Sequence, residues 1–407
     1  MKFLHIADVH LDSPFLGLSF LPSELFCQIK NAIQLSFEKA VNFAIDHDVD
    51  LVLLAGDTFD SIHPTPQSKI FFANQIKRLV DRQIQVVMVL GNHDYSQIDD
   101  LLLNESPYFK IIGSNEQIEQ VDFMTKSQYK YRVVGFSYQH NHITEDIIAK
   151  YPPKSTSIYT IGLAHAGMKQ SSVDQNNYAP FTLNEVKDLN YDYFALGHIH
   201  LRQVLSQEPW IVYSGNLQGR HVNEKDAKGF YFGQVDEQSQ NTQLQFIDVS
   251  PIVWQTVDLI LDEPFKSTTK LCAKIQNLLA DNNLRPTLFT VNIIGAELLS
   301  DAQLDMLNDK SMYEELSNNL QYHSLLVKVY YKHRDFIALN ATDRALFAKA
   351  AEEILTANHT CELASSLMKK SNIVTNNLQK EEYLSDIYEL ARVRLEQKLR
   401  GNNDEIN

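Results

Sequence analysis

The stretch FLHIADVH, residues Phe3 to His10, decides the fold of this chain and points to its chemistry. An apolar run of the kind that forms a buried strand ends here in an aspartate and a histidine, Asp8 and His10. Residues two apart in an extended chain point to the same side, so these two side chains can reach the same ligand. A carboxylate and an imidazole suit a metal ion that accepts oxygen and nitrogen donors. Alone the pattern is weak, because a strand can end in Asp-x-His by chance.

Four more apolar runs along the chain end in residues that bind metals. They close in Gly56-Asp57, in Gly91-Asn-His-Asp94, in His165 and in Gly197-His-Ile-His200. Five such endings in one chain make chance an implausible explanation. The candidate metal ligands are Asp8, His10, Asp57, Asn92, His165, His198 and His200. They are too many for one tetrahedral site but suit two ions that share a carboxylate, and such a pair clamps the attacking and leaving oxygens of a displacement at phosphorus.

The order of expected elements predicts the fold class. Residues 1–115 alternate apolar strands with amphipathic helices, one over residues 24–46 and one that Pro66 opens. This rhythm predicts right-handed crossovers and a mainly parallel sheet. Residues 130–250 carry short strands, which we expect to form a second sheet packed on the first. The expected fold is an α/β sandwich of two sheets, with the motifs at the carboxyl ends of strands, where open α/β sheets bind ligands.

The length of 407 residues and the changes of pattern predict three parts. Residues 1–250 form the domain that carries the motifs. Residues 251–335 read as a small α+β capping domain of order β-α-β-α-β, with one helix over residues 301–318. Residues 336–407 read as C-terminal helices that could dock a partner.

Composition bounds the location of the protein. The three cysteines are far apart and give neither a zinc site nor a disulfide framework, which suits the cytoplasm. We find no signal peptide and no apolar run of the ~20 residues that a membrane span needs. We therefore expect a cytoplasmic protein without a membrane anchor.

In their order, the five motifs resemble the signatures of the calcineurin-like metallophosphoesterases. The stretches Gly-Asp-Thr-Phe-Asp60 and Gly-His-Ile-His200 are similar to those of the DNA double-strand-break repair exonucleases of the SbcD type. The stretch Ser214-Gly-Asn-Leu-Gln-Gly-Arg-His221 resembles the bacterial YhaO subgroup more closely. The resemblance covers residues 1–221, and beyond them only the β-α-β-α-β pattern is similar to the capping domain of that branch.

The resemblance implies a role for each motif residue. One ion would be held by Asp8, His10, Asp57 and His200, and the other by Asp57, Asn92, His165 and His198, with Asp57 as the bridge. His93 would contact the scissile phosphate and assist the leaving oxygen, and Asp94 or another acid would orient its ring. The family favours manganese, although the donor set by itself permits Mn, Fe or Zn. Asp60 and Asp12 remain open as supporting acids behind the ligands.

The activity that this resemblance implies is hydrolysis of DNA phosphodiesters without sequence preference, by an exonuclease that acts in DNA repair. The net charge of −15 argues mildly against a non-specific nucleic-acid binder. Two divalent ions against two aspartates would nevertheless leave the site locally positive. Basic residues after the last motif could grip the DNA backbone. They are Arg202, Arg220, His221, Lys225 and Lys228, of which Arg220 and His221 are the substrate-binding candidates.

Two protein partners are also implied by the resemblance. The C-terminal helices would dock on the coiled coil of an SMC-like ABC ATPase. Helices between the second and third motifs, and just after the third, would build a homodimer. The apolar stripe from Ile70 to Val80 would take part, joined by Leu101 to Leu103 and by Phe109; without a dimer, that stripe is simply core.

Two other functions remain open at this point. A phosphodiesterase for nucleotides or other small phosphoesters would use the same ligands, although it does not need the domains after residue 250. A scaffold that places DNA ends while its metal site is silent would have no reason to keep all the ligands.

Overall fold

The structure is a computed structural model. It describes residues 1–15, 18, 21, 23–95, 106–169, 177–334, 349, 353–354, 356–370, 374–375, 378 and 381–404. The chain divides into two compact units, Met1–Trp254 and Gln255–Asn407. The three-part division expected from the sequence stays a prediction, because much of the stretch between residues 335 and 380 lies outside the described residues.

The first unit contains a six-stranded sheet in the order β12-β11-β1-β2-β3-β4. Its strands are β1 (Lys2–Ile6), β2 (Leu51–Ala55), β3 (Gln85–Val89), β4 (Phe109–Ile111), β11 (Gly229–Val235) and β12 (Thr242–Asp248). Neighbours among β1 to β4 are parallel, which confirms the predicted parallel ladder. Every residue of β2 and β3 is buried, as is usual for parallel strands that are covered on both faces.

A second six-stranded sheet has the order β5-β6-β7-β8-β10-β9. Its strands are β5 (Glu119–Met124), β6 (Lys130–Gly135), β7 (Tyr159–His165), β8 (Tyr193–Gly197), β9 (Gln203–Gln207) and β10 (Trp210–Tyr213). Strands β6, β7, β8 and β10 are parallel to one another, and antiparallel β5 and β9 form the edges.

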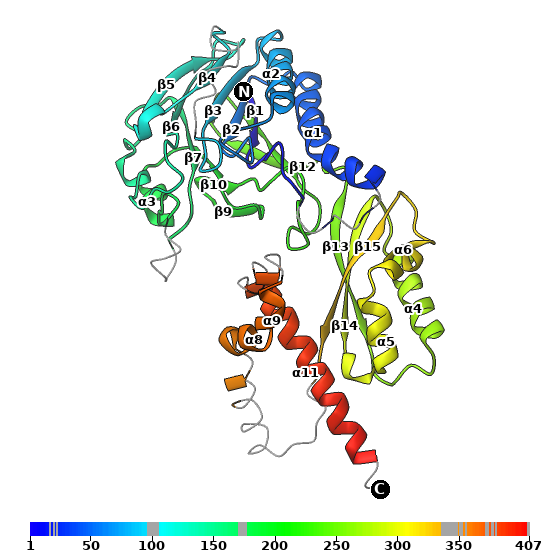
Figure 1. Ribbon diagram of the computed structural model, residues 1–407. Coiled ribbons are helices and arrows are strands. Elements are labelled where there is room, and N and C mark those ends of the chain that lie inside the picture. The colour runs from blue at the N-terminus through cyan, green and yellow to red at the C-terminus, as the bar shows by residue number, and fades with distance from the viewer. Residues whose placement is uncertain are drawn as a thin grey trace. The chain divides into compact units, whose positions relative to one another are not determined.

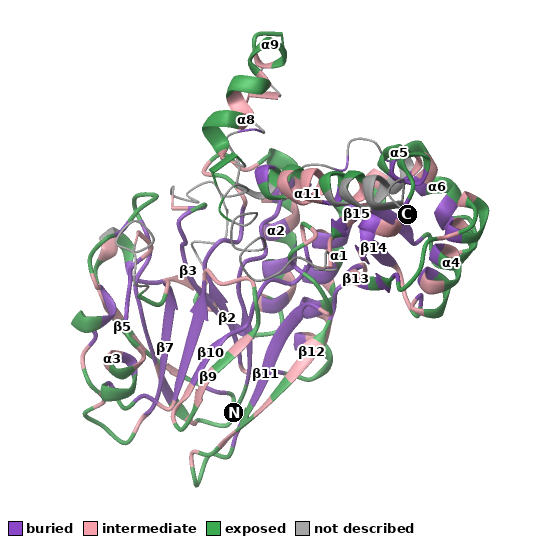
Figure 2. Ribbon diagram, turned by 90° about the horizontal axis from the view of Figure 1, so that it is seen from below, coloured by how far each residue is buried: buried purple, intermediate pink, exposed green. Residues whose placement is uncertain are grey.

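The main hydrophobic core lies between the two sheets. Phe3, Leu53 and Val87 from the first sheet share one buried cluster with Tyr131 and Ile161 from the second. Figure 2 shows the central strands of both sheets as buried. The predicted two-sheet α/β sandwich is therefore confirmed.

Helices cover the faces of the sheets that point away from this core. Helices α1 (Ser23–Asp46) and α2 (Pro66–Val80) lie together on one side of the first sheet (Figure 1). As predicted, α2 begins at Pro66, and its N-terminus is capped by Thr65, whose side chain accepts a hydrogen bond from the backbone N–H of Ser68. The second sheet is covered by shorter elements: η1 (Ser114–Glu116), η2 (Ile148–Lys150) and α3 (Leu183–Asp188).

Two expectations about strands are wrong. Strands β11 and β12 were expected in the second sheet, but β11 pairs antiparallel with β1 and carries β12 into the first sheet. A strand's apolar pattern does not specify its neighbour, because that choice depends on contacts between distant residues. The sequence also missed β4, β5 and β9, which are short or half-exposed and therefore lack a continuous apolar run.

The second unit is built on a three-stranded sheet in the order β13-β14-β15. Its strands are β13 (Val253–Ile260), whose first residues belong to the other unit, β14 (Thr287–Ile294) and β15 (Leu325–Lys332). Its helices are α4 (Thr268–Asp281), η4 (Ala296–Leu298), α5 (Asp301–Asn308), α6 (Ser311–Ser317), α8 (Ala357–Leu363), α9 (Ser365–Met368) and α11 (Glu381–Asp404). The predicted β-α-β-α-β order is confirmed. The single helix expected over residues 301–318 is two, because Asp309 is extended between α5 and α6.

Helix α11 packs along β15 and is held there by an ion pair and a hydrogen bond. Lys328 Nζ lies 2.8 Å from Asp386 Oδ2, and His333 Nδ1 lies 3.0 Å from Glu389 Oε2. Among the described residues, no helix is both long enough and apolar enough to cross a bilayer.

Candidate metal centre

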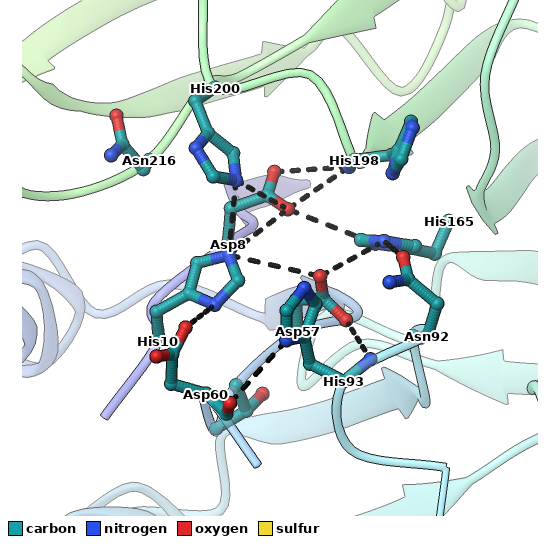
Figure 3. Close-up of polar contacts among 12 residues, drawn as sticks. Asp8, His10, Asp57, Asp60, Asn92, His93, His165, His198, His200 and Asn216 are labelled. Atoms are coloured by element: carbon teal, nitrogen blue, oxygen red, sulfur yellow. Dashed lines mark hydrogen bonds and ion pairs between the residues drawn. The ribbon is translucent and has the colours of Figure 1, made fainter. Parts of the chain in front are cut away.

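The loops after five strands meet at one edge of the first unit and bring the motifs together (Figure 3). The backbone N–H of Asp8 donates to Gly56 O at 3.1 Å, and that of His10 donates to Asp57 O at 3.0 Å. Asp8, His10 and Asp57 each have a φ of 50°, in the left-handed region that L-residues rarely adopt. Such a conformation costs about 1–3 kcal/mol per residue and persists where surrounding contacts impose it, typically at functional sites.

One group of donors comprises Asp8, His10 and His200, whose ligand atoms lie within 4.8 Å of one another. The Nε2 atoms of His10 and His200 are 3.0 Å apart. Asp8 Oδ1 lies 4.0 Å from Nε2 of His10 and 3.9 Å from Nε2 of His200. All three residues come from the motifs assigned to the first ion.

A second group surrounds His165. Its Nε2 lies 3.3 Å from Asp57 Oδ2 and 3.0 Å from Asn92 Oδ1. Asp57 Oδ2 also lies 3.8 Å from His10 Nε2, so this carboxylate stands between the two groups. That is the position expected of a bridging ligand.

Hydrogen bonds behind the rings fix which nitrogen faces the centre. Nδ1 of His200 donates to Glu224 Oε1 at 2.6 Å, Nδ1 of His165 donates to Ala55 O at 3.0 Å, and Nδ1 of His10 lies 2.9 Å from Asp60 Oδ1. With Nδ1 protonated, the neutral rings of His10 and His200 present a lone pair at Nε2, and His165 does so once its second proton has left.

This arrangement tests whether the residues fit metal ions. The Nε2 lone pairs of His10 and His200 face each other at 3.0 Å, so a proton or a cation must lie between them. Burial lowers the pKa of His10, although Asp60 opposes the shift, which disfavours the protonated ring. A divalent cation satisfies both nitrogens and the Asp8 carboxylate at once, so the donor set fits a metal. The two groups are consistent with a dinuclear site.

Asp57 and His165 form a strongly coupled buried pair. Burial opposes both shifts, but attraction to His165 lowers the pKa of Asp57, and attraction to Asp57 raises the pKa of His165 to about 9. Without bound metal, both ring nitrogens of His165 are therefore protonated at neutral pH, and the ring is positively charged.

Two motif glycines are required by close packing at this edge. A Cβ on Gly91 would lie 2.1 Å from Asp57 Oδ1, and a Cβ on Gly197 would lie 1.9 Å from Ala55 O. Any side chain there would push the ligand loops apart. The glycines recur in the motifs because the backbones touch.

His93 stands at the rim of the centre. Its side chain is exposed, whereas its backbone N–H donates to Asp57 Oδ1 at 2.9 Å. The prediction that Asp94 or another acid orients the His93 ring stays open: Asp60, whose backbone oxygen lies 3.4 Å from His93 Nδ1, is the acid beside the ring. Asp94 is buried and accepts backbone N–H groups of Gly91 at 2.7 Å and Thr58 at 2.6 Å, so it shapes the loops. Burial and the charge of Asp57 raise the pKa of Asp94 to about 6.

The ring of His198 is not in either donor group. Its backbone N–H donates to both carboxylate oxygens of Asp8 at 3.1 Å, but its imidazole lies against Tyr178, with ring centroids 4.6 Å apart. Figure 3 shows that ring turned away from the carboxylates of Asp8 and Asp57. Burial, followed by repulsion from His165, lowers the pKa of His198 to about 3. The ligand role of His198 stays a prediction.

The two acids that were expected to support the ligands, Asp60 and Asp12, have different roles in the structure. Asp60 lies behind His10, whereas Asp12 accepts hydrogen bonds from Thr65 and Ser68 and supports the start of α2. Glu224, behind His200, was missed by the sequence analysis. Burial raises the pKa of Glu224, but the hydrogen bond from His200 outweighs it and holds that pKa far below its usual range. The only sequence signal was its place just after the stretch that ends at His221.

Basic residues after the last motif are largely engaged within the protein. Arg220 Nη1 lies 2.5 Å from Asp60 Oδ1, and His221 Nε2 lies 3.2 Å from Glu224 Oε1. Lys228 is buried and donates to His200 O at 3.0 Å, and the Arg202 guanidinium lies 3.6 Å from the centroid of the Phe246 ring. The substrate contacts expected of Arg220 and His221 stay predictions.

Comparison with known proteins places these features in a family. Residues 1–202 match the family described as calcineurin-like phosphoesterase. The chain is 34% identical over 278 residues to the uncharacterized metallophosphoesterase YhaO of Bacillus subtilis, covering 68% of this chain and 67% of that protein. It is 24% identical to the DNA double-strand break repair protein Mre11 of Sulfurisphaera tokodaii, covering 56% of this chain and 58% of that protein.

A solved structure is also similar at low level. It is a dimetal phosphatase from Danio rerio, with a TM-score of 0.37 and 14% identity, covering 61% of this chain and 99% of that chain. A likeness of this size carries no weight for function. The family match and the relative in Bacillus subtilis do: the chain belongs to the calcineurin-like metallophosphoesterases, as its motifs predicted, and is a metal-dependent phosphoesterase.

Proposed function

We propose that this protein hydrolyses the phosphodiester bonds of DNA, as an exonuclease that uses two divalent ions, with Mn²⁺ as the metal. The observation that carries the proposal is that the two donor groups meet at Asp57, whose Oδ2 lies 3.3 Å from His165 Nε2 and 3.8 Å from His10 Nε2, with His93 exposed beside them. The relatives named as DNA double-strand break repair proteins support DNA as the substrate, although they match only 56% of this chain at 24–25% identity.

The residues of the chain have separate tasks in this proposal. Bound divalent ions supply Lewis acidity for the attacking water and neutralise charge on the phosphate. Asp8, His10 and His200 hold one position, and Asp57, Asn92 and His165 hold the other. All of these residues except His200 are buried, which strengthens the charge interactions among them.

His93 is placed to act on the substrate. Nδ1 of its ring faces the backbone oxygen of Asp60 at 3.4 Å, which leaves Nε2 for a substrate oxygen. A protonated ring could donate from Nε2 to the leaving oxygen. Its exposure at the rim, beside the ligand loops, is what contact with a polymer requires.

Metal binding should strengthen with rising pH. The pKa of His165 is raised to about 9, and a cation binds the neutral ring, so binding must release the proton of His165. We expect Mn²⁺ affinity to rise by up to about tenfold between about pH 7 and about pH 8, with about one proton released. Calorimetric titration in buffers of different ionisation enthalpy measures both. An affinity that does not change with pH would show that His165 is not a ligand.

His93→Ala should abolish hydrolysis without loss of metal. We expect the turnover number to fall by about 10²–10⁴-fold, because a proton donor is removed. The assay uses end-labelled linear duplex with Mn²⁺, Mg²⁺ or chelator, and metal content is measured on the same samples.

Small phosphodiesters are assayed in parallel, because a net charge of −15 is unusual for a non-specific nucleic-acid binder. Cleavage of these compounds alone would replace DNA with nucleotides or other small phosphoesters as the substrate. Wild-type protein that binds DNA ends but cleaves nothing would support the silent scaffold.

We propose a homodimer formed through α2. Phe72, Ile76 and Leu79 on this helix are buried core, but Ile70 is 62% exposed. Phe109, which was expected to join these helices at the dimer interface, is buried in β4, and Leu101 to Leu103 lie outside the described residues. Ile70→Asp should yield a monomer by light scattering, whereas Leu284→Asp, at an exposed leucine of the second unit, should not. A wild-type monomer at micromolar concentration would contradict the proposal.

We also propose that α11 docks on an SMC-like ABC ATPase. Ile387 and Tyr383 are 40% exposed and Leu395 is 45% exposed, although the helix is fastened to β15 by its other side. An apolar helix face of this kind suits the groove of a coiled coil. Ile387→Asp should weaken co-purification with such an ATPase, with Leu284→Asp as control. Recovery of equal amounts of the ATPase with both variants would contradict docking through α11.

A further inference from the structure

The histidines of the first donor group are supported from behind by two acids and one arginine. We name Asp60, Arg220 and Glu224 the acid clasp. Asp60 Oδ1 lies 2.9 Å from His10 Nδ1, and Glu224 Oε1 accepts from His200 Nδ1 at 2.6 Å. Each acid therefore faces the nitrogen opposite the one that points at the metal position.

Arg220 joins the two acids. Its Nη1 donates to Asp60 Oδ1 at 2.5 Å, and its Nε lies 3.9 Å from Glu224 Oε1. Its backbone N–H donates to Glu224 Oε2 at 2.7 Å. The guanidinium also reaches within 3.4 Å of His200 Nδ1, so it lies directly behind the ring.

The clasp is enclosed rather than presented to solvent. The side chains of Arg220, Asp60 and Glu224 are 15%, 16% and 6% exposed. Two carboxylates at this depth need a compensating charge, and Arg220 supplies it. The guanidinium hydrogen-bonds Asp60 and faces Glu224 Oε1 as an ion pair at 3.9 Å, with no hydrogen bond from its Nε to any described residue. The single ammonium of lysine cannot keep this planar geometry.

The clasp also joins the two sheets. Asp60 follows β2 of the first sheet, whereas Arg220 and Glu224 follow β10 of the second. His10 and His200 likewise come from different sheets. The distance between their Nε2 atoms thus depends on a contact that crosses from one sheet to the other.

We propose that Arg220 is a positioning residue, not a phosphate-binding one. By holding Asp60 and Glu224, it aims Nε2 of His10 and His200 at the first metal position and sets the affinity of that ion. Among the described residues, no hydrogen bond or ion pair joins Asp57, Asn92 or His165 of the second group to the clasp. Asp57 Oδ2 instead lies 3.8 Å from Nε2 of His10, one of the rings that the clasp supports. The inference rests on the proposed dinuclear site and assigns one of its two ions to the clasp.

The test is a Mn²⁺ titration of the full chain without substrate. Arg220→Gln should weaken one of two binding events by about 10–100-fold, the usual effect of losing a partner behind a metal ligand, and leave the other unchanged. At Mn²⁺ concentrations that fill both wild-type sites, electron paramagnetic resonance should show isolated Mn²⁺ in place of a coupled pair. Arg220→Lys should not restore the weakened event.

Arg132→Gln is the matched control. Arg132 forms a bidentate pair with Asp122 on β5 and β6 of the same unit, at 2.5 Å and 2.9 Å. It should bind both ions like the wild type. Two unchanged binding events in Arg220→Gln, with only a higher KM that Arg220→Lys restores, would overturn the clasp in favour of direct phosphate contact.

A second variant guards against misfolding. If Arg220→Gln loses its circular dichroism signal, Glu224→Gln, which preserves shape and removes charge, takes its place with the same expected loss of one ion. When Asp60→Asn is combined with either variant, the loss of Mn²⁺ affinity should be smaller than the sum of the losses in the single variants, because these residues act through one network. Additive effects would overturn the proposal. A wild-type chain that binds fewer than two ions would instead overturn the dinuclear site itself.

Discussion

Two imidazole nitrogens facing each other at 3.0 Å, beside a buried carboxylate, are the constraint on which the rest of this structure depends. In the tautomer that places a proton on the nitrogen nearest the acid in each ring, both Nε2 atoms are acceptors. Such a cluster is stable only with positive charge at its centre. The fold therefore brings together ligand atoms that a divalent cation stabilises.

The backbone around these ligands is strained and closely packed. The ligands Asp8, His10 and Asp57 adopt left-handed conformations, and the glycines beside them allow contacts that no Cβ would permit. Parallel strands deliver the loops to one edge, and hydrogen bonds between loops from different strands hold them there. The strain is offset by the extensive core between the sheets.

The effect of a charged residue depends on where the fold places it. A net charge of −15 describes the whole surface, whereas the site is governed by a few groups within about one Debye length of one another, ~8–10 Å at ordinary salt. Arg220 and Lys228 looked like a basic stretch for gripping DNA. In the structure Arg220 donates to Asp60 and Lys228 donates to a backbone oxygen, so both positive charges are engaged within the protein.

The sequence by itself determined that five strands end in residues of the kinds that bind metals, that the first three strands are parallel and that a small β-α-β-α-β unit follows. These features depend on local periodicity and on which residue closes a strand, and both are written in short stretches of chain. Only the tertiary structure decided that β11 and β12 join the first sheet, that the ring of His198 turns toward Tyr178 and that Asp94 binds loop backbone. It alone revealed Glu224 behind His200, 24 residues away in sequence. Sheet membership, ring orientation and the partner of a buried charge depend on residues far apart in the chain, and no local pattern records them.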